Sequence, residues 1–240
     1  MTGNINIEKI INEAFAKVRY AYYKAKGEHS DDKECTQLVF PRYRDKDDDV
    51  KGEIRVSEQE FRFAFVEAFN EVTKGTNFTY SIETPTRDTY LFSEGITSAE
   101  RKLNDKLPCI TEYGESANID LVVYKEDEIV ALIEFKCGTP KLEDYEKDMV
   151  KLTNEKESDE HAQRYFLQLL ETSKDETITS IRNKRLDVLA QKQKSDKNVR
   201  AVNYRCYSLN HKGEKQEQPI HKRVFKFSIP KAQQLNIIAL

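Results

Sequence analysis

The chain has 240 residues and a net charge of −3, with 34% charged and 38% hydrophobic residues. This length fits one large domain, and 12 Phe with 12 Tyr supply side chains for a core, which excludes a disordered chain. No apolar stretch reaches membrane-spanning length, the N-terminus lacks a signal-peptide core and the four cysteines show no paired spacing, so we expect a cytoplasmic protein without a membrane partner, zinc site or disulfide framework.

The first 55 residues are predicted to form a helix and an acidic loop that extend the main domain. Apolar residues recur at helical spacing over residues 6–26, and Gly27 follows as a stop signal. Residues 28–53 are polar and predict a loop. Tyr20, Tyr22 and Tyr23 either form a homodimer interface or pack into the core, and core packing is the more common fate of such side chains.

A second helix is expected over residues 57–73, with Ser57 as the N-cap and Glu60 completing a capping box. Strands are then predicted over residues 77–86 and 89–92, with Pro85 ending the first, and a short helix over residues 98–105. The nearly continuous apolar runs at 118–124 and 129–137, joined by a short polar turn, predict a hairpin covered on both faces.

The remaining elements complete a mixed α/β order. Helices are expected over residues 143–153, 160–173 and 176–194, and strands over 199–209 and 222–229. We therefore predict one globular unit, in which residues 1–55 form the extension and residues 56–240 form the main domain, with helices packed on a central sheet.

Three charges interrupt the predicted hairpin. Glu134 and Lys136 point to one face of their strand, and pairing across the turn brings Asp120 near Glu134. Charges in a covered strand cost free energy unless they are paired or bind something. Two converging carboxylates with an ammonium group could hold Mg²⁺ for phosphodiester hydrolysis, whereas a buried ion pair, Glu134–Lys136 or Asp120–Lys136, would explain the same spacing without catalysis.

The motif resembles the PD-(D/E)XK nuclease superfamily. Ile119-Asp120, a gap and Glu134-Phe135-Lys136 match its acid on one strand and acid-x-Lys on the next, although Ile119 replaces the usual Pro. The resemblance covers roughly residues 56–209 and implies an α/β fold with a restriction-endonuclease-like core, a central mixed sheet flanked by helices, an extra N-terminal helix and a C-terminal hairpin.

The resemblance also implies the roles of the site residues. Asp120 and Glu134 would bind Mg²⁺ or Mn²⁺ with the Phe135 carbonyl, and Lys136 would assist the attacking water. The first helix of the superfamily often lends a glutamate, and Glu58 fits this role better than Glu60, because Glu58 lies on the apolar stripe that faces the sheet.

Basic residues supply candidate contacts to nucleic acid. Residues 174–240 hold 15 Lys and Arg against 6 Asp and Glu, whereas residues 1–173 hold 24 against 36, which predicts a localised positive face or simply solvated surfaces. On the helix after the motif, Lys147, Asp148 and Lys151 could reach the site or the DNA backbone, or belong to a solvated face. The further candidates for phosphate contacts are Arg182, Lys184, Arg185, Arg200 and Arg205.

The sequence thus predicts a metal-dependent nuclease with DNA as its substrate and RNA as the alternative. A restriction or other defence role suits such a chain, and cutting two strands favours a homodimer. The alternative is a catalytically inactive module that keeps the fold and binds nucleic acid or protein.

Overall fold

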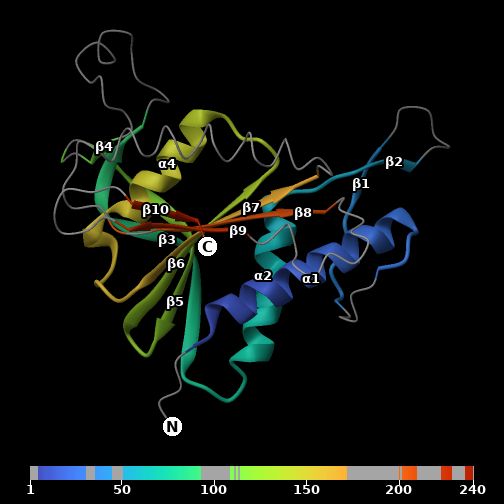
Figure 1. The fold of residues 1–240 in the computed structure, drawn as a ribbon, viewed down its shortest axis with the longest axis horizontal. Coiled ribbons are helices and arrows are strands. Elements are labelled where there is room, and N and C mark those ends of the chain that lie inside the picture. The colour runs from blue at the N-terminus through green and yellow to red at the C-terminus, as the bar shows by residue number, and fades with distance from the viewer. Residues whose placement is uncertain are drawn as a thin grey trace.

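The computed structural model shows an α/β protein built on a large mixed sheet (Figure 1). It describes residues 5–30, 36–44, 51–92, 109–110, 112, 114–171, 200, 202–209, 223–228 and 236–239. None of the helices in these ranges is long and apolar enough to cross a membrane. The predicted helices over residues 98–105 and 176–194 lie outside the described residues.

The eight strands of the main sheet follow the order β10-β9-β8-β7-β6-β5-β3-β4. Strands β6, β7 and β8 run parallel to one another, and the other neighbouring pairs are antiparallel. The strands are β3 (Phe78–Leu91), β4 (Cys109–Ile110), β5 (Glu115–Lys125), β6 (Glu128–Cys137), β7 (Gln163–Leu170), β8 (Asn203–Ser208), β9 (Arg223–Ser228) and β10 (Asn236–Ala239). The predicted mixed sheet and the hairpin of β5 and β6 are confirmed.

Helices cover both sides of this sheet. Helices α1 (Ile7–Lys26) and α2 (Glu58–Val72) lie together on one side, and α4 (Leu142–Thr153), followed by the short helix η1 (Glu155–Glu157), lies on the other (Figure 1). Helix α1 ends where predicted, because Gly27 adopts a φ of 76° that favours glycine. These three α-helices agree closely with the predicted ranges.

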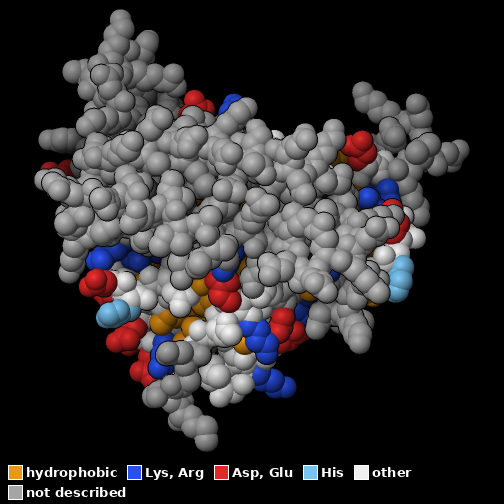
Figure 2. All heavy atoms as spheres, in the orientation of Figure 1, with side chains coloured by type: hydrophobic (Ala, Val, Ile, Leu, Met, Phe, Trp, Pro, Cys, Tyr) orange, Lys and Arg blue, Asp and Glu red, His pale blue; other side chains and the backbone are white. Residues whose placement is uncertain are grey.

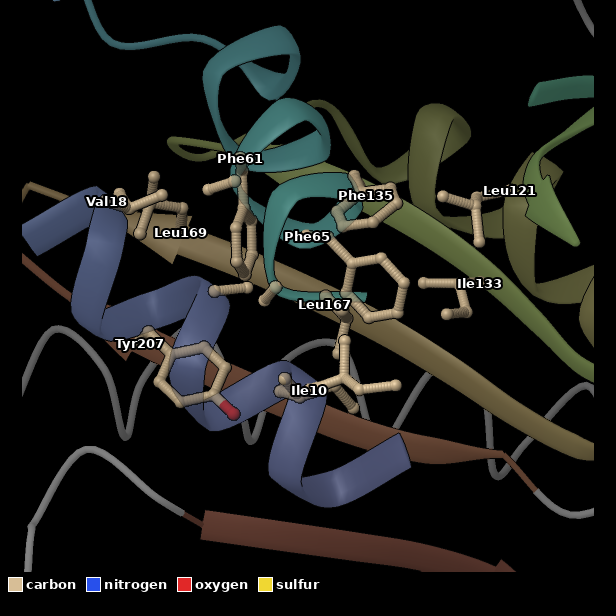
Figure 3. Close-up of a cluster of buried hydrophobic side chains, with 14 of the residues drawn as sticks. Ile10, Val18, Phe61, Phe65, Leu121, Ile133, Phe135, Leu167, Leu169 and Tyr207 are labelled. Carbon is tan, nitrogen blue, oxygen red and sulfur yellow. The ribbon is translucent and has the colours of Figure 1, made fainter. Parts of the chain in front are cut away.

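Alternating side chains of the strands separate two apolar clusters. Phe135 of β6 and Leu167 of β7 face α1 and α2, where Phe61 and Phe65 pack edge-on against the Phe135 ring (Figure 3). Leu132 and Phe166 face α4 instead, together with its buried Tyr145 and Met149. Because α1 and α2 share one cluster, the predicted N-terminal extension contributes directly to the core.

The sequence left open whether the tyrosines of α1 form a dimer interface or pack into the core. Tyr22 and Tyr23 are buried within the chain, and Tyr22 packs edge-on against Phe40. These two side chains therefore belong to the core, and the structure does not offer them as a surface for a second copy.

The predicted helix over residues 160–173 is wrong. Residues 163–170 form β7, and every side chain from Arg164 to Leu170 is buried. An amphipathic helix would leave one face in water, whereas a central parallel strand is covered on both faces. Glutamine and leucine favour helices, but burial between β6 and β8 decides the conformation.

Smaller predictions also need correction. Residues 78–91 form one strand, because Pro85 only accompanies an irregularity in the pairing with β5. Part of the predicted loop at 28–53 forms a two-stranded sheet of β1 (Arg42–Arg44) and β2 (Lys51–Ile54). Ser57 makes no capping bond to the backbone and instead donates to the Glu60 carboxylate, which also pairs with Arg55.

Candidate functional site

The candidate site forms where β5 and β6 separate. Their ladder runs to the Leu121–Ile133 pair, after which the backbone N–H of Phe135 donates to Oδ2 of Asp120 at 2.8 Å. On the β5 side of Phe135, the side chain of Asp120 thus takes the place of a backbone partner. This contact holds Asp120 beside the Glu134-Phe135-Lys136 segment of β6.

Helix α2 fixes the other oxygen of Asp120. Arg62 donates through Nη2 to Oδ1 of Asp120 at 2.8 Å and through Nη1 to Oε1 of Glu83 at 2.5 Å. Glu83 has a φ of 51°, in the left-handed region, in the strand that neighbours β5. Arg62 therefore ties α2 to both strands beside the motif, a role that no sequence pattern indicated.

Glu134 is buried at 1% exposure and pairs with a lysine of α4 rather than with Lys136. Lys151 Nζ lies 2.6 Å from Glu134 Oε1, 3.1 Å from Asp148 Oδ1 and 2.7 Å from the carbonyl oxygen of Asn118. Burial raises the pKa of Glu134 well above its usual range, and Asp148 adds to this effect while Lys151 opposes it.

Lys136 also has its partners outside the strand. Its Nζ lies 2.7 Å from Asp148 Oδ2 and 3.8 Å from Glu58 Oε1. Burial acts to lower the pKa of Lys136, but Asp148 and Glu58 together raise it above its ordinary value. Lys136 is therefore held as an ammonium ion, and neither of the two ion pairs considered from the sequence is its direct contact.

Glu58 is the first residue of α2, and its carboxylate enters the same site. Burial raises the pKa of Glu58, and Lys136 opposes that rise. The network thus runs from Glu58 through Lys136 and Asp148 to Lys151 and Glu134, with each cation lying between carboxylates.

These side chains line one cavity of about 540 Å³. Its walls carry seven carboxylates and three lysines, so ionised side chains would leave it strongly negative. Lys147, one of the three lysines, lies 4.8 Å from the centre of the Phe92 ring. The lining residues are Glu58, Glu83, Phe92, Glu115, Ser116, Ala117, Asn118, Asp120, Glu134, Lys136, Pro140, Asp144, Lys147, Asp148 and Lys151.

The oxygen atoms that line the cavity include some of the ligands that Mg²⁺ would need. Within the part of the chain that is described, no group of three or more His, Cys, Asp or Glu side chains is arranged to hold a metal ion. Two carboxylates are nevertheless enough for Mg²⁺, which keeps several waters and takes phosphate oxygens from a substrate. Asp120 and Glu134 line the same cavity, and the Phe135 carbonyl accepts from Lys136 Nζ at 3.3 Å beside them.

The predicted contacts to nucleic acid fall in different places. Lys147 and Lys151 line the cavity, with Lys151 at its buried wall rather than on an open helix face. Arg205 is 4% exposed and pairs at 2.5 Å with Glu8 of α1, on the side of the sheet away from the cavity, and its contact with phosphate stays a prediction. Arg200 lies 3.9 Å from Glu160. Arg182, Lys184 and Arg185 lie outside the described residues.

The surface view adds little support for a single positive face. Acidic and basic side chains lie next to one another on the described part of the face drawn in Figure 2. The basic C-terminal third falls mostly outside the described residues, so its predicted positive face stays a prediction.

Comparison with known proteins gives no match, whether with family models, curated proteins or solved structures.

Proposed function

We propose that this protein is a metal-dependent nuclease that hydrolyses phosphodiester bonds of DNA in the cavity beside β5 and β6. The observation that carries the proposal is the meeting of Glu58, Asp120, Glu134 and Lys136, from three separate elements, in one cavity. The resemblance of the Ile119-Asp120 and Glu134-Phe135-Lys136 segments to the PD-(D/E)XK superfamily supports the reaction class, and DNA rather than RNA rests on that resemblance alone.

The charge of the cavity supports a need for a metal. Seven carboxylates against three lysines would repel a phosphate diester, and a bound divalent cation would reduce this negative charge and coordinate the phosphate directly. Mg²⁺ or Mn²⁺ held by Asp120 and Glu134, with the Phe135 carbonyl, would acidify a bound water and neutralise charge on the phosphate oxygens.

The chain's own residues would perform the remaining work. Lys136 stays an ammonium ion beside Asp148, so it would stabilise negative charge on the phosphate rather than remove a proton from water. Arg62 and the Phe135 N–H hold both oxygens of Asp120 in place, which limits the motion of that ligand. Restriction or another defence role is part of the same proposal.

Cleavage assays test the proposal directly. Supercoiled plasmid, single-stranded DNA and single-stranded RNA are incubated with the protein and Mg²⁺, Mn²⁺ or EDTA. We expect DNA cleavage only with metal, and a loss of about 100-fold or more in Glu134→Gln and in Lys136→Met. Lys156→Met, which removes an exposed lysine paired with Asp88, is the matched control and should cut at the wild-type rate. The proposed nuclease activity would be ruled out if wild type cuts no nucleic acid, or if both site variants cut at the wild-type rate.

A second candidate function is an inactive module with this fold that binds nucleic acid or protein. The observation that favours it is that protein groups already bind the proposed ligands: Arg62 and the Phe135 N–H at Asp120, and Lys151 at Glu134. The same assay separates the two, because this module would retain DNA in a gel-shift experiment without cutting it in any metal.

A further inference from the structure

Lys151 has surroundings that are unusual for a lysine. Its side chain is 4% exposed, and its Nζ lies between Glu134, which is 1% exposed, and Asp148, which is 5% exposed. The Asn118 carbonyl completes a set of three oxygen atoms around this nitrogen. Carboxylate and carbonyl oxygens gathered around one positive charge are the ligands that hard cations take in proteins.

A second observation indicates that this position is built for a cation in general. Glu134 Oε1 and Asp148 Oδ2 are fully buried and accept no well-directed hydrogen bond from the described residues, although ammonium groups lie near both. At 2.6 and 2.7 Å, the positive charge of the ammonium groups is what holds these two buried oxygens. A metal ion can supply the same positive charge to carboxylate oxygens.

We propose that the ammonium group of Lys151 occupies a cation position between Glu134 and Asp148, and that a divalent metal ion binds Glu134 by displacing it. Lys151 lies in the last turn of α4, so its long side chain can leave the position by rotation while the helix stays in place. This inference rests on the metal site of the proposed function and adds Asp148 as a ligand that the sequence motif does not contain.

Thermal unfolding of the full chain with Mn²⁺ or EDTA tests the displacement. Lys151→Met keeps the length of the side chain and removes its charge, so the position becomes free for a metal ion. We expect Lys151→Met to have a lower melting temperature than wild type in EDTA. Addition of about 1 mM Mn²⁺ should raise the melting temperature of this variant by about 5 °C or more. Wild type, whose own ammonium competes with the metal, should gain less than half as much.

Two further variants locate the effect. Lys17→Met removes another buried lysine that contacts two glutamates, Glu67 and Glu71, at the α1–α2 contact. Those glutamates are 34% and 50% exposed and stay hydrated, so this variant should show no comparable gain with Mn²⁺. The double variant Lys151→Met/Glu134→Gln lacks the proposed ligand and should lose the gain as well.

The outcomes separate this inference from the proposed function. If Lys151→Met gains no more than wild type while wild type cuts DNA with Mn²⁺, the displacement is wrong and the nuclease stands. If Lys151→Met gains and no form of the protein cuts nucleic acid, the cation position stands and the nuclease is wrong. Lys151→Gln, whose amide can still donate to Asn118 or Glu134, repeats the test if Lys151→Met does not fold, and the absence of a gain there also overturns the inference.

Discussion

The two sides of the sheet each bury a lysine between two carboxylates, but the partners differ. On the α1 and α2 side, Lys17 contacts Glu67 and Glu71, whose side chains are 34% and 50% exposed. On the α4 side, the partners of Lys151 are 1% and 5% exposed and line a cavity. The first arrangement leaves its acids in water, whereas the second removes both acids from water.

The difference in exposure indicates that the Lys151 network, rather than the Lys17 ion pairs, has a role beyond stabilising the fold. At the α1–α2 contact the two glutamates stay partly hydrated, so the cost of desolvation falls mainly on Lys17. A buried network costs several kcal/mol per ion, which its mutual attraction offsets only with good geometry. Both sides of the sheet carry an apolar cluster that stabilises the fold. The α4 side also retains a network of buried charges that apolar residues of similar volume could often replace without loss of stability, which points to a function for them.

The largest expected loss of stability is at Phe135, the residue of β6 that faces α1 and α2. Phe135 is fully buried, with its ring centre 5.3 Å from that of Phe61 and 5.7 Å from that of Phe65 (Figure 3). Phe135→Ala should lower the free energy of unfolding by about 4 kcal/mol, measured by urea denaturation, because it removes apolar contacts and leaves a cavity. Phe63→Ala, at an exposed position of α2, is the control and should change this free energy by less than about 0.5 kcal/mol. A loss below about 1 kcal/mol in Phe135→Ala would contradict the described packing.

Arg62 tests whether the two sides are mechanically connected. Arg62→Met should lower the free energy of unfolding by about 3 kcal/mol, because it leaves Asp120 and Glu83 without the guanidinium that joins them to α2. Lys156→Met breaks an exposed ion pair with Asp88, so it is the control and should lower the free energy of unfolding by less than about 1 kcal/mol. Equal losses in the two variants, again in urea, would mean that Arg62 does not hold the site together.

Salt should distinguish the two buried lysines. Lys17→Met should cost about 2 kcal/mol at low ionic strength, because hydrogen bonds to two charged partners are lost. Because Glu67 and Glu71 are partly exposed to solvent, about 1 M NaCl should reduce this loss of stability. The cost of Lys151→Met should change much less with salt, since its partners are buried. The same salt dependence in both variants would remove the distinction between the two sides.

The sequence predicted the parts of this arrangement that depend on local patterns. Periodicity located α1, α2 and α4, and alternation indicated that Glu134 and Lys136 share a face, as their common cavity shows. Strict alternation along the strand would place Val130 on that face as well, which the structure contradicts. The pairing of β5 and β6 shifts between Val123 and Tyr124, and Val130 packs against the α1 and α2 cluster.

Long-range partners could not be predicted in the same way. Nothing in the sequence indicated that Arg62 of α2 contacts Asp120, and Asp148 of α4, the partner of Lys136, was expected only as one of three residues that could reach the site. Nothing in a helical pattern distinguishes an arginine that reaches a strand from one that reaches water. Strand β7 was likewise missed because the burial of both its faces depends on neighbours that assemble only in the fold.

The smallest expected effect compares the thiols on the two sides. Cys206 packs in the α4 cluster, and burial raises its pKa from 9.0 to about 12. Cys137 packs against the other cluster, and burial, with Glu171 and Glu58, raises its pKa to about 12 as well. Both thiols should therefore stay protonated in the folded protein at pH 8 and react with iodoacetamide far more slowly than free cysteine.

The raised pKa of Cys206 also predicts how stability changes with pH. Above about pH 9 the unfolded chain releases this proton while the folded chain keeps it, so the free energy of unfolding falls as the pH rises. Between about pH 9 and pH 10, wild type should lose about 1 kcal/mol more than Cys206→Ala in urea denaturation. Cys137, which is only partly buried, should show a difference in the same direction in Cys137→Ala. Parallel pH profiles for all three proteins would contradict the raised pKa of both thiols.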